Sequence, residues 1–245
     1  MLNNQLFQSV LANPEDLELR LVFGDWMESQ GSTLGELIRL QIELAKQAKD
    51  LKLELIPVVS RLEVHNVQLV SEQQREHAKA FFATLKRSNI MVAENRSEWN
   101  APIHRYFSEL GLKVSSRRAP IRGWNYERGF IEHVTATADA IGNYSNEIFR
   151  IGPIRSLTAM QCTFDDDIVS RWINDANLNQ VESFYLRNIR FQNAMVEERF
   201  WGKFLSRARE RTSGIHNYWA PAEGQLDQQF AQPRWLQRIL SVFNQ

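Results

Sequence analysis

Apolar residues recur at helical spacing in the first third of the chain. The segment 13–16, Asn-Pro-Glu-Asp, predicts a helix start, because asparagine caps free amides, proline fits the first turn and acids favour the positive end of the helix dipole. Leu17, Leu21 and Val22 follow at helical spacing. Gly31 lies just past this pattern, where a left-handed residue commonly ends a helix. The pattern therefore predicts a first helix that ends near Gly31.

A longer apolar stripe follows directly and predicts a second helix. Ser32 or Thr33 is expected to cap it, with Glu36 placed as in a capping box. Apolar residues then step by three or four positions; they are Leu37, Leu40, Leu44, Ala48, Leu51 and Leu55. Pro57 predicts a break or kink, and another helical run is expected over 60–88. The N-terminal third is therefore predicted to be all-α.

The segment 20–41, RLVFGDWMESQGSTLGELIRLQ, resembles the bacterial repeat-companion domain. Members of that family read as R-L-V-x-A-D-W-L-E-E-x-G, followed by G-E-F-I-R-L-Q. The matching positions are Arg20, Leu21, Val22, Asp25, Trp26, Glu28, Gly31, Gly35, Glu36, Ile38, Arg39, Leu40 and Gln41. The chain departs at Gly24, where the family usually has alanine, and at Leu37, where it usually has an aromatic residue. The resemblance implies no catalytic activity, but it implies leucine-rich-type repeats further along the chain.

The charged residues of this segment are interpreted as structural. They are Asp25, Glu28, Glu36 and Arg39. Acids and an arginine at these positions are expected to tie two helices together at a turn. Acid–base chemistry is the alternative, but no histidine or nucleophile lies nearby in the sequence to complete a catalytic site.

Three segments in the second half fit the apolar pattern of a leucine-rich-type repeat, L-x-x-L-x-L. They are Ile131, Val134 and Ala136; Ile154, Leu157 and Ala159; and Val181, Phe184 and Leu186. Corresponding residues are 23 and then 27 positions apart, within the range of roughly 20 to 29 for such repeats. Helix-compatible stretches follow at about 138–150, 165–177 and 192–211. The acids at 165–167 are interpreted as helix caps, and Cys162 as a hydrogen-bonding residue of the repeat turn.

These patterns predict an α/β protein in four parts. We expect a helical repeat-companion domain at 1–90, an irregular connector at 91–128 with a short helix near 101–111, about three leucine-rich-repeat-like units at 129–211, and a tail with a cap helix at 212–245. In a short solenoid of such repeats, parallel strands line one face and helices cover the other.

The side chains between the apolar repeat positions are predicted to point out from the sheet, on a surface that we call the strand face. Its mixture of charge, hydroxyls, methionine and tyrosine suits a protein or peptide partner. The candidate contacts are His133, Thr135, Arg155, Thr158, Met160, Tyr185 and Arg187, with Tyr218 and Trp219 of the tail as a second docking element. The plainer alternatives are a solvated sheet face, a face covered by the chain's own tail, and a tail that only caps the last repeat.

Composition narrows the functional classes. The 245 residues carry 29 basic and 29 acidic side chains, so no general attraction to nucleic acid is expected. A single cysteine and the lack of a long apolar run or basic leader favour a cytoplasmic protein without a membrane partner.

The chain carries no recognisable catalytic or ligand-binding motif. It shows no metal-ligand spacing of histidines, no phosphate-binding loop and no nucleophile elbow, so no cofactor, metal or catalytic residue is expected. The leading hypothesis is a non-enzymatic adaptor. The alternatives are an accessory subunit that docks onto an enzyme encoded nearby, or presents a peptide substrate to it, and an enzyme whose site forms no motif.

Overall fold

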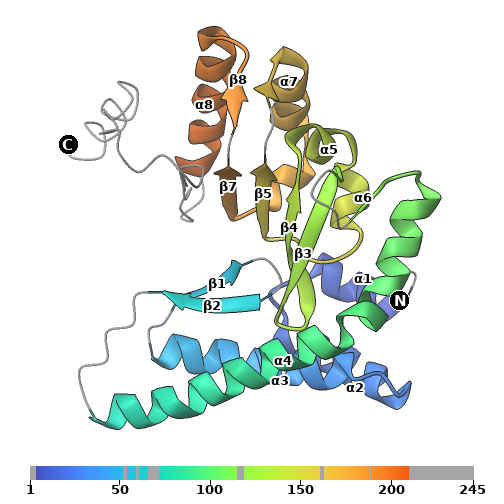
Figure 1. The fold of residues 1–245 in the computed structure, drawn as a ribbon, viewed down its shortest axis with the longest axis vertical. Helices are drawn as coiled ribbons and strands as arrows, with labels where there is room; N and C mark the ends of the chain where they lie inside the picture. The colour runs from blue at the N-terminus through green and yellow to red at the C-terminus, as the bar shows by residue number, and fades with distance from the viewer. Residues whose placement is uncertain are drawn as a thin grey trace.

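The protein combines α-helices with a four-stranded mixed sheet, which confirms the predicted α/β class (Figure 1). The computed structural model describes residues 4–51, 54–58, 61–65, 72–114, 119–160, 163–187 and 189–209. Within these segments there are eight α-helices, one short 3-10 helix and eight strands. None of the helices found there is both long enough and apolar enough to cross a membrane.

Three helices form the beginning of the chain; the second and third match the two predicted helices, and the first is not predicted. They are α1 (Gln5–Ala12), α2 (Leu17–Ser29) and α3 (Leu34–Asp50). Gly31 has a left-handed φ of 76°, as expected for a residue that ends a helix. Asn13 does not cap the next helix but follows the end of α1, and Asp16 caps α2 instead. The hydroxyl of Ser32 accepts a hydrogen bond of 3.3 Å from the Leu34 amide at the start of α3.

A β-hairpin interrupts the predicted helical domain. Its antiparallel strands are β1 (Glu54–Val58) and β2 (Arg61–His65). The all-α prediction for residues 1–90 is therefore wrong here, and α3 ends at Asp50. β-Branched valine and isoleucine recur between 54 and 65, and they favour a strand over a helix. Pro57, which predicts a helix break, lies inside β1.

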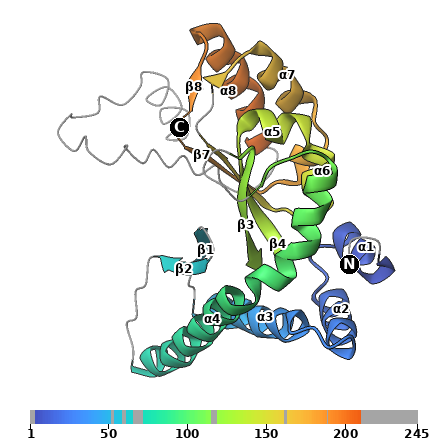
Figure 2. The same ribbon diagram turned by 45° about the vertical axis from the view of Figure 1, so that its right-hand side comes forward.

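A single long helix, α4 (Glu72–Glu109), replaces much of the predicted connector at 91–128. The helical runs predicted over 60–88 and 101–111 belong to this helix, which begins only at Glu72. The connector prediction is wrong. The segment is rich in polar residues, but its buried apolar residues recur at helical spacing; they are Val92, Trp99, Ile103 and Phe107. The helix is bent (Figures 1 and 2). Pro102 lies within it and cannot donate a backbone hydrogen bond.

The three predicted repeat segments lie side by side as parallel strands. The sheet order is β3-β4-β5-β7, with β3 antiparallel to β4 and the other neighbours parallel. The strands are β3 (Ile121–Glu127), β4 (Phe130–Ala136), β5 (Ser156–Met160) and β7 (Ser183–Arg187). Val134, Leu157 and Phe184 are in register, as their repeat positions predict. The arrangement does not show a solenoid, because the sheet is mixed and β3 comes from the predicted connector.

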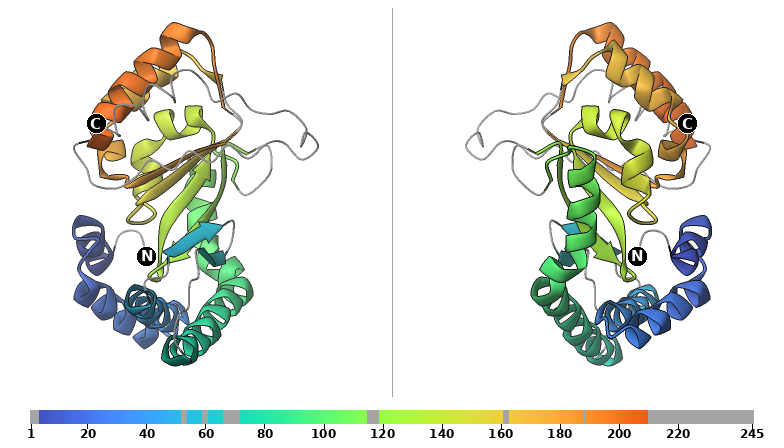
Figure 3. Two further views of the ribbon diagram at one scale, coloured as in Figure 1. Left: turned by 90° about the vertical axis from the view of Figure 1, so that its left-hand side faces the viewer. Right: turned by 90° about the vertical axis from the view of Figure 1, so that its right-hand side faces the viewer.

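Helices cover one face of this sheet (Figure 3). They are α5 (Ala138–Asn143), α6 (Ser145–Phe149), α7 (Asp166–Asn174), the 3-10 helix η1 (Asn177–Gln180) and α8 (Ala194–Arg209), beside a short parallel pair β6 (Thr163–Phe164) and β8 (Arg190–Phe191). Trp172 is fully buried between them; its Nε1 donates to the Ala138 carbonyl at 2.8 Å. Asp165 caps α7 by accepting from the Ile168 amide at 2.8 Å, as predicted for the first acid of its run.

Several predicted features lie outside the described residues. They are Cys162, the tail and cap helix at 212–245, and the candidate contacts Tyr218 and Trp219 within that tail. The predictions for these residues therefore stay predictions.

Candidate functional site

The turn between β3 and β4 is the point where the N-terminal helices hold the sheet. Arg128 and Gly129 form the turn with φ values of 49° and 79°, the left-handed pair that matches the twist of a tight hairpin. The buried Gln41 side chain of α3 accepts from the Gly129 amide at 2.7 Å and donates to the Tyr126 carbonyl at 3.3 Å. Its amide also donates to the Ser88 hydroxyl of α4 at 2.9 Å. One glutamine thus joins two helices to the hairpin.

A buried ion pair fixes the same hairpin to α2. Arg20 and Glu132 are 0% and 1% exposed, and their charged atoms lie 2.5 Å apart. Arg20 also donates to the Pro14 carbonyl at 2.8 and 2.5 Å, and its guanidinium lies over the Phe130 ring at 5.0 Å. Burial lowers the pKa of Arg20, although the charge of Glu132 acts in the opposite direction.

Arg128 completes this arrangement from the turn itself. It bonds Glu132 at 2.5 and 3.1 Å, so that one buried carboxylate lies between two guanidiniums. Burial disfavours the charged Arg128, but Glu132 outweighs this effect and raises the pKa of Arg128 above its ordinary value. We call the set Arg20, Gln41, Arg128, Gly129 and Glu132 the hairpin clamp.

Arg155, a predicted partner contact, belongs to the outer end of the same network. It pairs with Glu15 before α2 and with Glu182 before β7. Arg128 also approaches Glu15 at 3.4 Å. Burial tends to raise the pKa of Glu15, but Arg128 and Arg155 outweigh burial and lower it. The charge of Arg155 is therefore already neutralised within the chain.

Three of the four charged residues of the companion-like segment hold α2 against α3, as predicted. Arg39 forms ion pairs with Asp25 and Glu28, and all three lie at the surface. The helices also approach closely at Gly24 and Gly35, because a Cβ at Gly35 would overlap the Gly24 carbonyl. Glu36 pairs with Arg87 of α4.

The strand face carries a buried histidine surrounded by hydroxyl groups. His133 Nδ1 lies 2.6 Å from the Ser156 hydroxyl, and its Nε2 lies 3.1 Å from Thr158 and 3.3 Å from Thr135. These four side chains are only 4–8% exposed. The sequence predicts that they point out from the sheet, but it does not reveal that they are buried and bonded to one another.

His133 is held in its neutral form. Burial, with a smaller contribution from the charge of Arg187, lowers the pKa of His133 to about 3. Among the contacts of the described residues, no carboxylate reaches the ring. Within the described residues, the pair of Ser156 and His133 therefore has no acidic group of the kind that orients a histidine base in a catalytic triad.

Lowering the pH below about 6.5 is expected to destabilise the protein through His133. In the unfolded chain the imidazole binds a proton near its ordinary pKa of 6.5, whereas in the folded protein it stays neutral down to about pH 3. The unfolded state binds more protons in this window, so stability falls with the pH by up to about 1.4 kcal/mol per unit. Urea unfolding at several pH values should show that the free energy of unfolding falls less steeply with decreasing pH in His133→Gln than in the wild type. Equal slopes for the two proteins would contradict the assignment.

Three side chains form the partly exposed rim of the strand face: Met160, Tyr185 and Arg187. Met160 and Arg187 are neighbours in register on β5 and β7. The Tyr185 ring lies 5.9 Å from the His133 ring. The Nε of Arg187 is buried and has no hydrogen-bond partner within the described chain. The structure thus brings together six of the predicted contacts, and it leaves Arg155 in the ion network.

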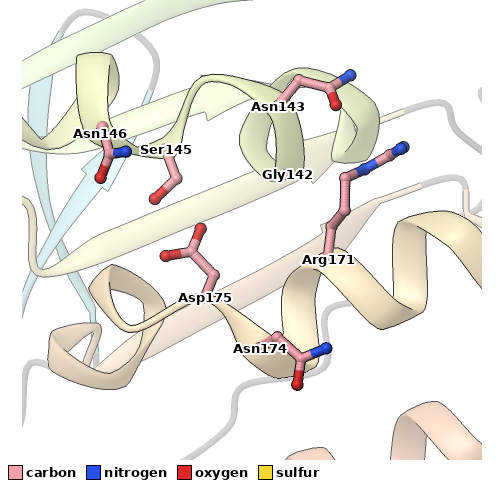
Figure 4. A pocket seen from close by; sticks show the side chains of 7 residues that line it. All are labelled: Gly142, Asn143, Ser145, Asn146, Arg171, Asn174 and Asp175. Carbon is pink, nitrogen blue, oxygen red and sulfur yellow. The ribbon is translucent and has the colours of Figure 1, made fainter.

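A polar pocket between α5, α6 and α7 carries no signal in the sequence. Its volume is roughly 250 Å³, and it is lined by Gly142, Asn143, Ser145, Asn146, Arg171, Asn174 and Asp175 (Figure 4). Asn177 donates to Ser145 at 2.9 Å and to Asn146 at 2.8 Å, and Arg171 donates to Asp139 at 2.9 Å. These groups bond mainly to one another, so they hold the helices together.

Comparison with known proteins finds no matching family model, no matching curated protein and no matching solved structure. Within the segments that the structure describes, no group of three or more His, Cys, Asp or Glu side chains is placed to hold a metal ion. We therefore infer function from the geometry of the strand face and of the hairpin clamp.

Proposed function

We propose that the protein is a non-enzymatic adaptor that binds a protein or peptide partner on the rim of the strand face. The observation that carries this proposal is the combination of a hydrogen-bonded polar floor with a partly exposed rim. His133, Ser156 and Thr158 are fixed by hydrogen bonds, while Tyr185 and Arg187 at the rim remain partly exposed. Tyrosine and arginine are enriched among the residues that dominate binding energy at interfaces.

The position of β7 supports the same proposal. It is the last strand of the four-stranded sheet in the described chain, next to β5 on one side only. An edge strand offers backbone donors and acceptors to an extended segment of a partner, and the neighbouring side chains then supply selectivity. The rim residues Tyr185 and Arg187 belong to this strand.

The hairpin clamp gives the N-terminal helices a role in this proposal. Arg20 and Gln41, which match positions of the repeat-companion motif, both bond the β3–β4 hairpin. We infer that the helical unit acts as a brace for the sheet. Such a brace gives a physical reason for a companion domain to accompany repeats.

Affinity capture with the full chain tests the proposed function. We expect the wild type to retain a stoichiometric partner. Tyr185→Ala should bind that partner at least tenfold more weakly, because truncating an interface anchor typically removes more than about 1.4 kcal/mol of binding energy. Asn143→Ala, on the exposed side of the remote pocket, is the control and should retain the partner. Thermal unfolding of both variants checks that the fold is kept.

Two outcomes would count against the strand face as the docking surface. The first is the capture of no protein at all by the wild type. The second is equal retention by the wild type and by folded Tyr185→Ala. A captured protein with enzymatic activity would instead favour the accessory-subunit alternative, with the same surface in use.

A further inference from the structure

We infer that the partner segment is acidic, and that one of its carboxylates binds the guanidinium of Arg187. This inference rests on the proposed function and names the chemistry of the partner. Arg187 lies on β7, and its register neighbour on β5 is Met160. The partner that we infer is an extended acidic peptide segment that lies along the edge strand β7.

The first observation is the buried Nε of Arg187, which has no hydrogen-bond partner among the described residues. Two other arginines near the sheet, Arg128 and Arg155, are matched by Glu132, Glu15 and Glu182. Arg187 has no ion pair within the part of the chain that the structure describes, and its buried Nε has no hydrogen-bond partner there. A buried donor is normally hydrogen-bonded. A carboxylate can accept from two nitrogens of an arginine guanidinium together, in the bidentate geometry that arginine favours.

The charge around Arg187 is the second observation. The buried polar groups on this face include the His133 ring, the Asn125 amide and the hydroxyls of Ser156, Thr158 and Thr135, and none of these is acidic. The charge of Arg187 acts on His133 and contributes to its lowered pKa. Glu132, the acid of β4, bonds Arg20 and Arg128 at the hairpin clamp. Among the described residues no acid compensates the charge of Arg187, so the face attracts an anionic group and repels a basic one.

The geometry of an added strand also predicts the spacing of the residues that contact Arg187 and Tyr185. Side chains of an added strand alternate between two faces, so every second residue of the partner points toward the strand face. Tyr185 precedes Arg187 by two residues on the same face of β7. The segment that fits is thus an acidic residue opposite Arg187, with an apolar or aromatic residue two positions away against Tyr185.

Peptide selection on the intact protein tests the inference. A phage-displayed library of random linear peptides is selected on the wild type, on Arg187→Glu and on Arg190→Glu. Arg190 is an exposed arginine of β8 outside the strand face and provides the matched control. We expect wild-type and Arg190→Glu selections to enrich Asp or Glu at one position. Arg187→Glu is expected to enrich Lys or Arg at that same position.

Fluorescence anisotropy with a selected peptide gives the magnitude. Replacing its enriched acid with the corresponding amide should weaken binding to the wild type at least tenfold, and should change binding to Arg187→Gln less than twofold. The Gln variant keeps a polar side chain of moderate size, and circular dichroism verifies that it folds. Loss of discrimination in this variant distinguishes a direct contact from a general electrostatic effect.

The outcomes separate this inference from the proposed function. One outcome would be peptides that bind the wild type, fail to bind Tyr185→Ala and show no acidic preference. This outcome would overturn the inference but would support the docking surface. An acidic preference that persists unchanged in Arg187→Glu also overturns it. Recovery of no peptide above background counts against both. Reversal of the preference in Arg187→Glu alone supports both.

Discussion

Replacing Glu132 with glutamine is expected to lower the free energy of unfolding by about 3–5 kcal/mol, the range for breaking a buried ion pair from one side. The substitution removes the negative charge that lies between Arg20 and Arg128. Arg20 is fully buried, so its guanidinium cannot regain water as a substitute partner. Urea unfolding measures the change, and most of it is expected in the midpoint rather than in the slope.

Two further variants isolate the cause of this loss. Glu182→Gln removes a carboxylate at the outer end of the same network, where the side chain is 43% exposed, and should change stability by at most about 1 kcal/mol. The double variant Arg20→Met with Glu132→Leu should recover part of the loss, because it removes the two fully buried charges and leaves only Arg128, which is 12% exposed, without Glu132. An effect of Glu132→Gln no larger than that of Glu182→Gln would contradict the importance of burial.

Replacing Gly129 with alanine is expected to destabilise the protein by about 2–5 kcal/mol, through left-handed backbone strain and overpacking together. Gly129 has a φ of 79°, and a Cβ there would overlap Ile38 of α3, within 2.5 Å of its Cα. Backbone would have to move at the point where Gln41 accepts from the Gly129 amide. Thermal or urea unfolding provides the measurement.

Gly31→Ala is the matched control for this prediction. Gly31 has nearly the same φ, 76°, but a Cβ there meets nothing within 4 Å. Its substitution should show only the backbone component, about 1–2 kcal/mol. If both alanine variants lose the same stability, the close approach between the hairpin turn and α3 has no energetic role.

Local and periodic signals allow much of this fold to be predicted from the sequence. The left-handed Gly31 and the end of α2 beside it follow from capping chemistry, which acts over a few residues. The register of Val134, Leu157 and Phe184 follows from a repeat spacing that aligns parallel strands. Both signals are contained in short stretches of chain.

The features missed from the sequence depend on long-range contacts or on a mixed composition. α4 keeps an apolar stripe through a segment rich in polar residues, and the composition obscures that stripe. Arg20 meets Glu132 across 112 positions, and no local pattern announces this pairing. Burial of His133 likewise depends on how the sheet is covered, which alternation along one strand does not specify.

The hairpin clamp fixes one edge of the sheet, at β3, and leaves the other edge, at β7, outside the clamp. β3 turns back antiparallel and is fixed to the helices by Gln41 and Arg20, whereas growth by parallel pairing continues through β4, β5 and β7. A further strand-and-helix unit inserted after α8 would therefore leave every contact of the clamp unchanged, while a unit inserted before β4 would separate Arg128 from Glu132. The sheet can thus gain strands on its β7 side without disturbing the clamp, whereas an insertion between Arg128 and Glu132 breaks it.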